Sequence, residues 1–158
     1  MSQFLDVLLP APLGDGVQWA HMQPFRYQSD ILRALALATH PDGLVEILPH
    51  EMGSVTDFGS IPKPLQNIYP VWSRAGAGYC VHDALYFWQT TTREVADNIL
   101  REAMIVLGVD GVTVNAIYNG VRLFGQAAWD HNAALKANGY QKRVPLGESN
   151  PPYAGVPI

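Results

Sequence analysis

The amino-acid sequence predicts an α+β fold, in which a small antiparallel β-sheet in the N-terminal half precedes a three-helix C-terminal region. The first observation is the distribution of proline: all 12 prolines lie in residues 1–78 and 144–158, and residues 79–143 contain none. The second is hydrophobic periodicity. After residue 78, apolar residues recur with the 3.6-residue period of helices, whereas the first half divides into short apolar segments bounded by turn residues. Strands followed by helices in this order indicate an α+β protein.

Three short segments of the first half, residues 4–9, 17–22 and 43–48, are expected to be strands. The last of these is the clearest, because Leu44-Val45-Glu46-Ile47-Leu48 is apolar, contains β-branched residues and is ended by Pro49. These segments are long enough to pair as a small antiparallel sheet.

Residues 29–39 are expected to form a helix inside this β-rich half. Ser29 is a suitable N-cap, and the apolar residues that follow it share one helical face. The members of that face are Ile31, Leu32, Leu35 and Ala38. Because the apolar run is continuous, its period is ambiguous, and a strand is the alternative for this segment.

The proline-free region predicts two helices joined by a short turn. The first is expected at about residues 78–89 and the second at about 92–107. Thr91 and Glu94 have the spacing of a capping box at the start of the second helix, and Gly108 follows its last periodic residue. The two helices are therefore expected to pack as an antiparallel hairpin.

A third helix is expected at about residues 112–138. Its apolar positions recur at helical spacing, and Gly139 ends it. These positions are Val114, Ile117, Tyr118, Val121, Phe124 and Ala128.

The length of 158 residues is that of one domain. Residues 1–143 are expected to form it, with strands and loops in 1–78 and helices in 79–143. Residues 144–158 read as a proline-rich extended tail, which can lie along a partner protein. The charged fraction of 15% is low, so the surface is expected to be covered in a homo-oligomer or a larger assembly.

Charge and hydropathy argue against nucleic-acid binding and against a transmembrane helix. The net charge is −4, and no basic cluster exceeds Lys142-Arg143, so nucleic-acid binding is not expected. No run approaches the roughly 18 apolar residues that a transmembrane helix needs. Residues 1–12 carry Asp6 where a signal peptide has a basic start, so the chain is expected to fold in a cytoplasm.

The residues with most chemical potential lie in the expected helical hairpin. His82 and Tyr86 are one turn apart on the first helix and share a face, and Asp83 points about 100° away from His82. Asp97, on the second helix, is flanked by apolar residues and needs buried polar partners. His82 and Tyr86 are the natural candidates.

These residue types suit a water-activating site. The imidazole of His82 titrates near neutral pH and can take a proton from water, while Asp97 orients its ring. Asp83 can help to hold a hard cation such as Ca²⁺, with backbone carbonyls as further ligands. The alternative is a polar network in the core. A His82–Asp97 hydrogen bond facing a cleft favours catalysis, whereas a sealed core opposes it.

The pattern His-Asp-x-x-Tyr on one helix with Asp on the next resembles the active site of phospholipases A2, in particular the disulfide-poor bacterial and parvoviral-capsid versions. The resemblance implies that His82 is the general base, Asp83 the calcium-ligating carboxylate, Tyr86 the supporting phenol and Asp97 the partner of the histidine. It also implies a lipid substrate. The sequence departs from the pattern upstream, where no Y-G-x-x-G-type calcium loop is present.

A second resemblance spans most of the chain. Its motifs are Val55-Thr56-Asp57-Phe58-Gly59-Ser60-Ile61-Pro62, His82-Asp83-Ala84-Leu85-Tyr86, Ala96-Asp97 and Val121-Arg122-Leu123-Phe124-Gly125 followed by Trp129. Their order is similar to domain-of-unknown-function family 1353, whose Thr-Asp-Phe-Ala-Ser-Ile-Pro box has Gly59 here. That resemblance implies a tailed phage or prophage origin, with phage structural proteins as partners and the host cytoplasm or the virion as location.

Asp57, in the first of these motifs, has two interpretations. Asp57 or Ser60 can cap a helix that begins at Ile61-Pro62, since proline is favoured at a helix start. Alternatively, Asp57 lies beside Asp83 as a second cation ligand. The other histidines, His21, His40, His50 and His131, are in turn-like or polar contexts and are not expected to be ligands.

Two functions from different classes follow. One is a calcium-dependent ester hydrolase of phospholipase A2 type, in which His82 activates water. The other is a non-enzymatic virion or tail-associated protein, in which the polar cluster docks helices. A peptidoglycan hydrolase is a weaker third candidate, because the spacing of zinc peptidases is absent from the sequence.

Overall fold

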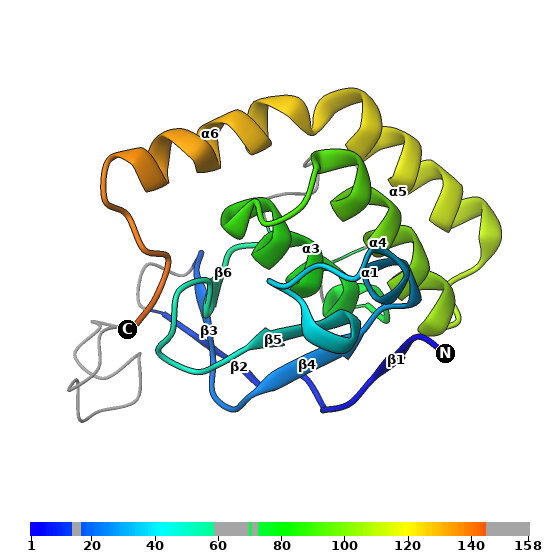
Figure 1. Cartoon of the computed structure of the whole chain (residues 1–158), viewed down its shortest axis with the longest axis horizontal. Coiled ribbons are helices and arrows are strands. Elements are labelled where there is room, and N and C mark those ends of the chain that lie inside the picture. Colours follow the sequence, from blue (N-terminus) through cyan, green and yellow to red (C-terminus); the bar gives the residue numbers. More distant parts are fainter. Residues whose placement is uncertain (14–16, 59–69, 71–72, 145–158) are drawn as a thin grey trace.

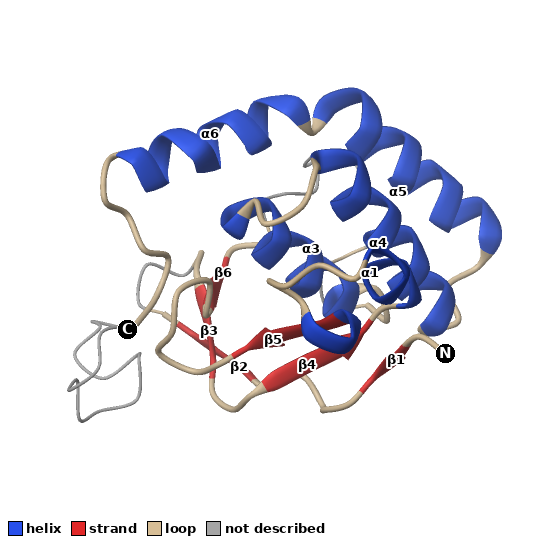
Figure 2. Cartoon of the chain, in the orientation of Figure 1, coloured by secondary structure: helices blue, strands red, loops and turns tan. Residues whose placement is uncertain are grey.

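The computed structural model describes residues 1–13, 17–58, 70 and 73–144, and its architecture is α+β, as the sequence predicts. The strands lie on one side of the molecule and the long helices on the other (Figure 1; Figure 2). The strands form two three-stranded antiparallel sheets, ordered β1–β4–β5 and β2–β3–β6, where one sheet is expected. Their bounds are β1 (Gln3–Phe4), β2 (Pro10–Pro12), β3 (Trp19–His21), β4 (Phe25–Gln28), β5 (Leu44–Ile47) and β6 (Val55–Thr56).

Strand β5 confirms the prediction for residues 43–48, and β3 lies inside 17–22. The expected strand at 4–9 is wrong in extent, because only Phe4 belongs to β1. Beyond it Asp6 turns to the side chain of Arg26, which it binds through two N–O contacts of 2.8 and 2.9 Å. Strand β4 is missing from the prediction, although Phe25-Arg26-Tyr27-Gln28 has the period-two alternation of a half-buried strand.

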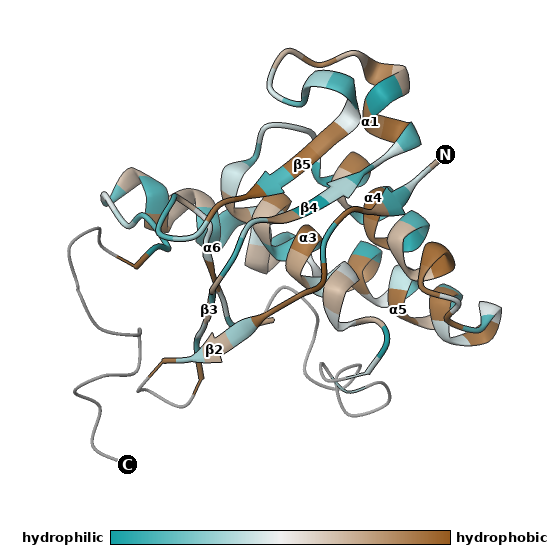
Figure 3. Ribbon diagram, turned by 90° about the horizontal axis from the view of Figure 1, so that it is seen from below, coloured by the Kyte–Doolittle hydropathy of each residue, from teal (hydrophilic) through white to brown (hydrophobic). Residues whose placement is uncertain are grey.

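One face of the sheet β1–β4–β5 packs against the helices. Phe25 and Tyr27 of β4 and Val45 and Ile47 of β5 point inward and are at most 1% exposed. They belong to the same apolar core as residues of the helices. Figure 3, seen from the sheet side, shows β4 and β5 lying across α3 and α4.

The helix expected at residues 29–39 is present as α1 (Asp30–Leu35), so the alternative of a strand is wrong. The Ser29 side chain accepts from the Leu32 N–H at 3.3 Å, as its N-cap role predicts. The helix ends earlier than expected because Ala36 adopts a left-handed conformation, with φ 49°. A short 3₁₀ turn, η1 (Pro41–Gly43), then leads into β5.

Helix α3 (Gly76–Trp88) is the centre of the fold and confirms the first predicted helix. From Gly78 to Phe87 every residue is buried. A helix that is buried on all sides must be covered by several elements at once. Figure 1 shows α3 between the strands and the other helices.

Helix α4 (Arg93–Val106) confirms the second predicted helix and packs along α3. Its N-cap is Thr92, whose side chain accepts from the Val95 N–H at 3.3 Å. The expected capping box of Thr91 and Glu94 is therefore wrong by one residue. Thr92 has the extended backbone angles that a cap requires.

The third predicted helix is two helices, α5 (Gly111–Phe124) and α6 (Gln126–Ala137), so the C-terminal region has four helices among its described residues and not three. The break at Gly125 coincides with contacts from two other helices, α3 and α4. The Arg122 carbonyl, near the end of α5, accepts from the Arg93 guanidinium at 3.3 Å. Gly125 also lies directly against the Tyr86 hydroxyl.

After α6 the chain returns to the sheet β2–β3–β6. The Lys142 carbonyl accepts from the backbone N–H groups of Gly53 and Val55 at 3.0 and 3.2 Å. Val144 is 5% exposed and packs with Ala20 and Val55. This return carries the Lys142 side chain to the interior. The tail expected at 144–158 lies outside the described residues from position 145 onward.

None of the helices in the described part of the chain has the length and apolar character needed to cross a bilayer, in agreement with the prediction from sequence.

The contact between Gly125 and Tyr86 predicts that alanine at position 125 destabilises the protein more than alanine at position 111 does. A Cβ at Gly125 would lie 2.5 Å from both the Tyr86 hydroxyl and the Val121 carbonyl oxygen. Gly125→Ala is expected to lower the free energy of unfolding by about 1–3 kcal/mol. Gly111→Ala is the matched control, because a Cβ there meets nothing within 4 Å. Thermal melts of the two variants against the unsubstituted protein measure both effects, and equal melting temperatures for the two variants would contradict the argument.

Candidate functional site

The carboxylate of Asp97 accepts hydrogen bonds from four side chains. Its Oδ1 accepts from His82 Nε2 at 2.9 Å and from the Tyr86 hydroxyl at 2.6 Å. Its Oδ2 accepts from Arg93 at 3.2 Å and from Arg122 at 2.9 Å. A carboxylate offers about four lone-pair sites, so Asp97 is saturated. We call these five residues the Asp97 cluster.

The Asp97 cluster joins three helices. His82 and Tyr86 come from α3, Arg93 and Asp97 from α4, and Arg122 from α5. Arg93 also donates to the Val121 carbonyl at 3.1 Å, near the end of α5. The cluster therefore fixes how these helices meet.

Both central members of the cluster are sealed from solvent: the side chains of His82 and Asp97 are 0% exposed. Burial by itself would raise the pKa of Asp97, but the hydrogen bonds from His82, Tyr86 and Arg122 and the charge on His82 lower it overall. Asp97 is thus ionised at neutral pH, with its charge balanced inside the protein. The predicted convergence of His82, Tyr86 and Asp97 is observed, and the described residues leave none of the His82 side chain exposed to water.

The orientation of the His82 ring follows from its partner. Ionised Asp97 can only accept, so Nε2 carries a proton and donates to it. The opposite nitrogen, Nδ1, is buried and has no hydrogen-bond partner among the described residues. This tautomer leaves Nδ1 as an acceptor when the ring is neutral.

Tyr86 is the second donor from α3. Its ring packs against the His82 ring with centroids 4.1 Å apart and edge-on against Trp129 of α6 at 5.1 Å. Burial, together with the nearby Asp97 carboxylate, raises the pKa of Tyr86 well above its ordinary value. The phenol therefore stays protonated and donates.

Asp83 does not join the Asp97 cluster, although it follows His82 in the sequence. Its Oδ2 accepts from the Lys142 ammonium at 2.6 Å, and the two side chains are 2% and 8% exposed. Burial by itself would lower the pKa of Lys142, but the charges of Asp83 and Asp57 and the hydrogen bond to Asp83 raise it overall. The pair is a buried salt bridge.

Asp57 lies near the same ammonium. Its Oδ1 is 3.9 Å from Lys142 Nζ, and its side chain is 42% exposed. The two aspartates predicted as cation ligands are therefore brought to one cation, which is Lys142. The alternative role of Asp57 or Ser60 as a cap for a helix at Ile61-Pro62 involves residues outside the described ones.

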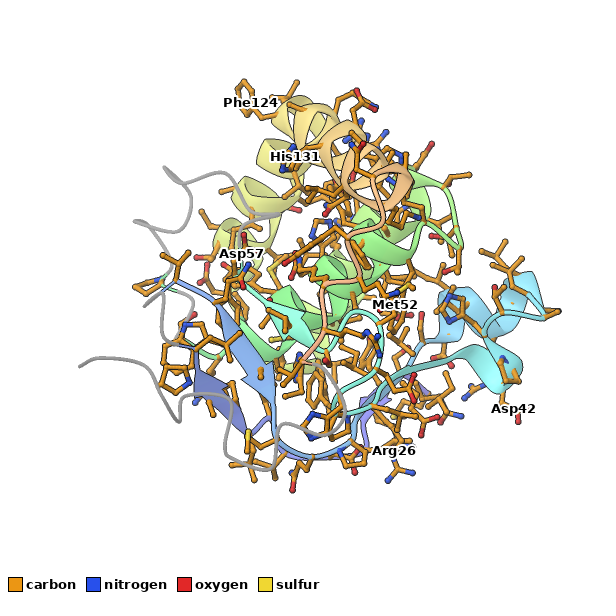
Figure 4. All side chains as sticks on the ribbon, turned by 90° about the vertical axis from the view of Figure 1, so that its left-hand side faces the viewer. Arg26, Asp42, Met52, Asp57, Phe124 and His131 are labelled. Carbon is orange, nitrogen blue, oxygen red and sulfur yellow. The ribbon has the colours of Figure 1, made fainter. Side chains whose placement is uncertain are left out.

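Asp57, Asp83 and Lys142 line an open cleft of about 360 Å³, which we call the Asp83 cleft. Figure 4 shows Asp57, at the end of β6, below His131 of α6. The remaining lining residues come from α6, from the segment after it and from the segment before β3. They are Gln18, Ala128, His131, Asn132, Leu135 and Tyr140.

The residues of the Asp83 cleft do not fit Ca²⁺ in this arrangement. Calcium takes 6–8 oxygen ligands at about 2.3–2.6 Å. Asp83 gives one of its oxygens to an ammonium at 2.6 Å. Across the described ranges, no three side chains of His, Cys, Asp or Glu gather as a metal-binding group. Calcium binding at Asp83 and Asp57 stays a prediction, and the observed cation is a side chain.

His21 is a further buried polar residue, which had not been expected to be a ligand. It ends β3, is 3% exposed, and neither ring nitrogen has a hydrogen-bond partner among the described residues. Burial lowers its pKa to about 4, the Asp83 charge acting in the opposite direction and Lys142 in the same direction. The ring stacks on Phe25 at 5.8 Å. His21 is therefore a neutral core residue.

Sequence patterns could have identified only one of the three basic residues that bind the buried carboxylates of Asp97 and Asp83. Arg93 precedes Asp97 by four positions, which places the two on one helical face and predicts an ion pair. Arg122 and Lys142 reach their carboxylates from 25 and 59 positions away, respectively. No local spacing indicates contacts at such separations.

Comparison with known protein families matches residues 21–121 to the family described as "Protein of unknown function (DUF1353)". The chain belongs to this family. The matched segment contains Asp57, His82, Asp83, Tyr86 and Asp97 and ends just before Arg122. No curated protein and no solved structure matches the chain. The match confirms the resemblance to this family over residues 21–121.

The buried pair of Asp83 and Lys142 predicts a large loss of stability when its cation is removed. Lys142→Met keeps most of the side-chain volume and leaves the Asp83 carboxylate without its ammonium. We expect the free energy of unfolding to fall by about 3–5 kcal/mol, as measured by chemical denaturation. Lys136→Met is the control, because Lys136 Nζ donates to the Trp88 carbonyl, a neutral group. Losses of equal size in the two variants would be inconsistent with a buried ion pair.

The lowered pKa of His21 predicts a pH-dependent stability. Between its unfolded value near 6.5 and its folded value of about 4, the unfolded chain binds more protons, so stability falls as the pH falls. The difference across this window is up to about 3 kcal/mol. His21→Phe should remove that component, while the exposed His131→Gln should not. Chemical denaturation at a series of pH values measures this component. If the free energy of unfolding depends on pH in the same way in His21→Phe and in the unsubstituted protein, His21 is not its source.

Proposed function

We propose that this DUF1353 protein is a non-enzymatic, particle-associated protein of a tailed phage or prophage, and that the Asp97 cluster docks its helices. The observation that carries the proposal is the burial of the cluster. His82 and Asp97 are 0% exposed, and all four acceptor positions of Asp97 are filled from three helices. A general base must reach a water molecule, and a saturated internal network instead specifies how helices pack.

The surface supports association with another protein. The chain has few charged residues: 10 are basic and 14 are acidic, which is 15% of the sequence. Large apolar side chains are exposed on α5, with Val112 81%, Leu123 72% and Phe124 67% exposed. Figure 4 shows Phe124 at the outer edge of the molecule. Exposed apolar side chains on one helix favour burial against a phage structural protein or a second copy of the chain. The phage setting is part of the proposal and rests on the sequence resemblance described above.

A hydrolase of phospholipase A2 type is the second candidate, and one observation favours it. His82 donates through Nε2 to Asp97 and leaves Nδ1 without a partner among the described residues. In a general base of this kind, one ring nitrogen of the histidine donates to a carboxylate and the other ring nitrogen can accept a proton. In this candidate a local opening of the helices brings water to Nδ1, and a cation at Asp83 polarises the ester.

The two candidates differ in their response to calcium and to His82→Ala. We expect no turnover of phosphatidylglycerol vesicles, phosphatidylcholine vesicles or p-nitrophenyl esters with calcium present, and no calcium-induced rise in melting temperature. We expect His82→Ala to lower the melting temperature, because Asp97 loses a buried donor. Exposed His131→Ala is the matched control. Calcium-dependent turnover that disappears in folded His82→Ala would establish the hydrolase instead.

Association with particles is measured separately. Mass spectrometry of particles purified from the encoding phage or prophage should find the chain at a constant ratio to the major structural proteins. Recovery of the chain only from the host lysate would contradict the particle-associated role. The helix-docking role of the Asp97 cluster is tested separately, by the melting temperature of His82→Ala.

A further inference from the structure

The Asp83 cleft brings together groups that the proposed helix-docking role of the Asp97 cluster does not use. Its floor is the buried pair of Asp83 and Lys142, and the Asp57 carboxylate stands beside that pair. At the rim, Gln18 Nε2 donates to the Tyr140 hydroxyl at 3.3 Å. With about 360 Å³, the cleft is at the small end of the volume range of ligand pockets.

Asn132 is the residue that indicates a ligand. It lies on α6, lines the cleft and is only 7% exposed. Its side chain lines the cleft, and no hydrogen bond between its carboxamide and a described residue is present. Buried polar groups nearly always have partners, and this amide has one acceptor and two donors to satisfy.

The lining disfavours three classes of ligand, which are divalent cations, anions and acyl chains. A divalent cation is disfavoured because the Lys142 ammonium already lies 2.6 Å from Asp83. An anion is disfavoured by the two carboxylates. An acyl chain would bury the carboxamide of Asn132 and the charged groups against hydrocarbon, which is costly.

A polyhydroxylated ligand matches the same lining. Each sugar hydroxyl donates one hydrogen bond and accepts others. One hydroxyl can donate to Asp57 while it accepts from Lys142, and its neighbour can pair with both ends of the Asn132 amide. The Tyr140 side chain, 39% exposed, offers an aromatic surface at the rim for the apolar face of a sugar ring.

We propose that the Asp83 cleft is a carbohydrate-binding site for one or two sugar units, with Asp57, Asn132 and Lys142 as the groups that bind ring hydroxyls. This site is independent of the Asp97 cluster, which faces the interior between α3, α4 and α5. The dissociation constant for a free sugar is expected in the millimolar range, as is usual for a small polar ligand with few contacts.

The test uses the full chain and four named probes: glucose, galactose, N-acetylglucosamine and chitobiose. Saturation-transfer NMR and titration should detect binding of at least one. Asn132→Leu, which keeps the shape and removes both polar groups, should weaken that binding at least about tenfold. Asn119→Leu is the matched control, since Asn119 is exposed on α5 and does not line the cleft. It should bind as the unsubstituted protein does.

A second variant separates loss of binding from loss of folding. Asp57→Asn changes a side chain that is 42% exposed, so the fold should persist in circular dichroism and thermal melts while sugar binding weakens. Absence of binding for all four probes would overturn the proposal. So would unchanged binding in Asn132→Leu. Calcium binding in the cleft without sugar binding would assign the site to a cation instead.

Discussion

The saturated carboxylate of Asp97 is the interaction on which the arrangement of the helices depends. A buried charge is tolerated only when its partners satisfy it, and here four donors from three helices do so. Arg93 extends the same network to the carbonyls of Val121 and Arg122, where α5 ends. Tyr86, held by Asp97, lies against Gly125 and leaves no room for a side chain there. The chain then continues as α6, which packs against α3 and supplies one wall of the Asp83 cleft.

The geometry of α3 explains why His82 and Asp83 take part in different structures. Successive residues of a helix point about 100° apart. Since α3 is buried on all sides, one of these directions leads to α4 and the other to the cleft between α6 and β6. His82 therefore receives a carboxylate, and Asp83 receives an ammonium. In a half-exposed helix, one of the two residues would have faced solvent.

The sequence predicts those features of the fold and site that depend on local spacing. The α+β class, α3, α4, the Ser29 cap and the convergence of His82, Tyr86 and Asp97 all follow from helical periodicity and capping chemistry. The break at Gly125 does not, because its cause is a tyrosine and an arginine on other helices. Strand β4 was recognisable from its alternation. The Lys142 contact with Asp83 spans 59 positions, so it depends on tertiary packing that no periodic pattern encodes.

The family match divides the Asp83 cleft into two parts. Residues 21–121 contain both carboxylates, whereas Asn132, Tyr140 and Lys142 lie beyond the matched segment. The two carboxylates thus lie in the matched segment, and the principal donors come from α6 and the segment that follows it. Lys142 reaches Asp83 only because its carbonyl is held by Gly53 and Val55 beside β6. A change in the C-terminal segment would therefore keep the carboxylates of Asp57 and Asp83 and alter the hydrogen-bond donors of the cleft. The groups that decide between a cation and a hydroxyl ligand therefore lie on α6 and on the segment that returns from it to the sheet.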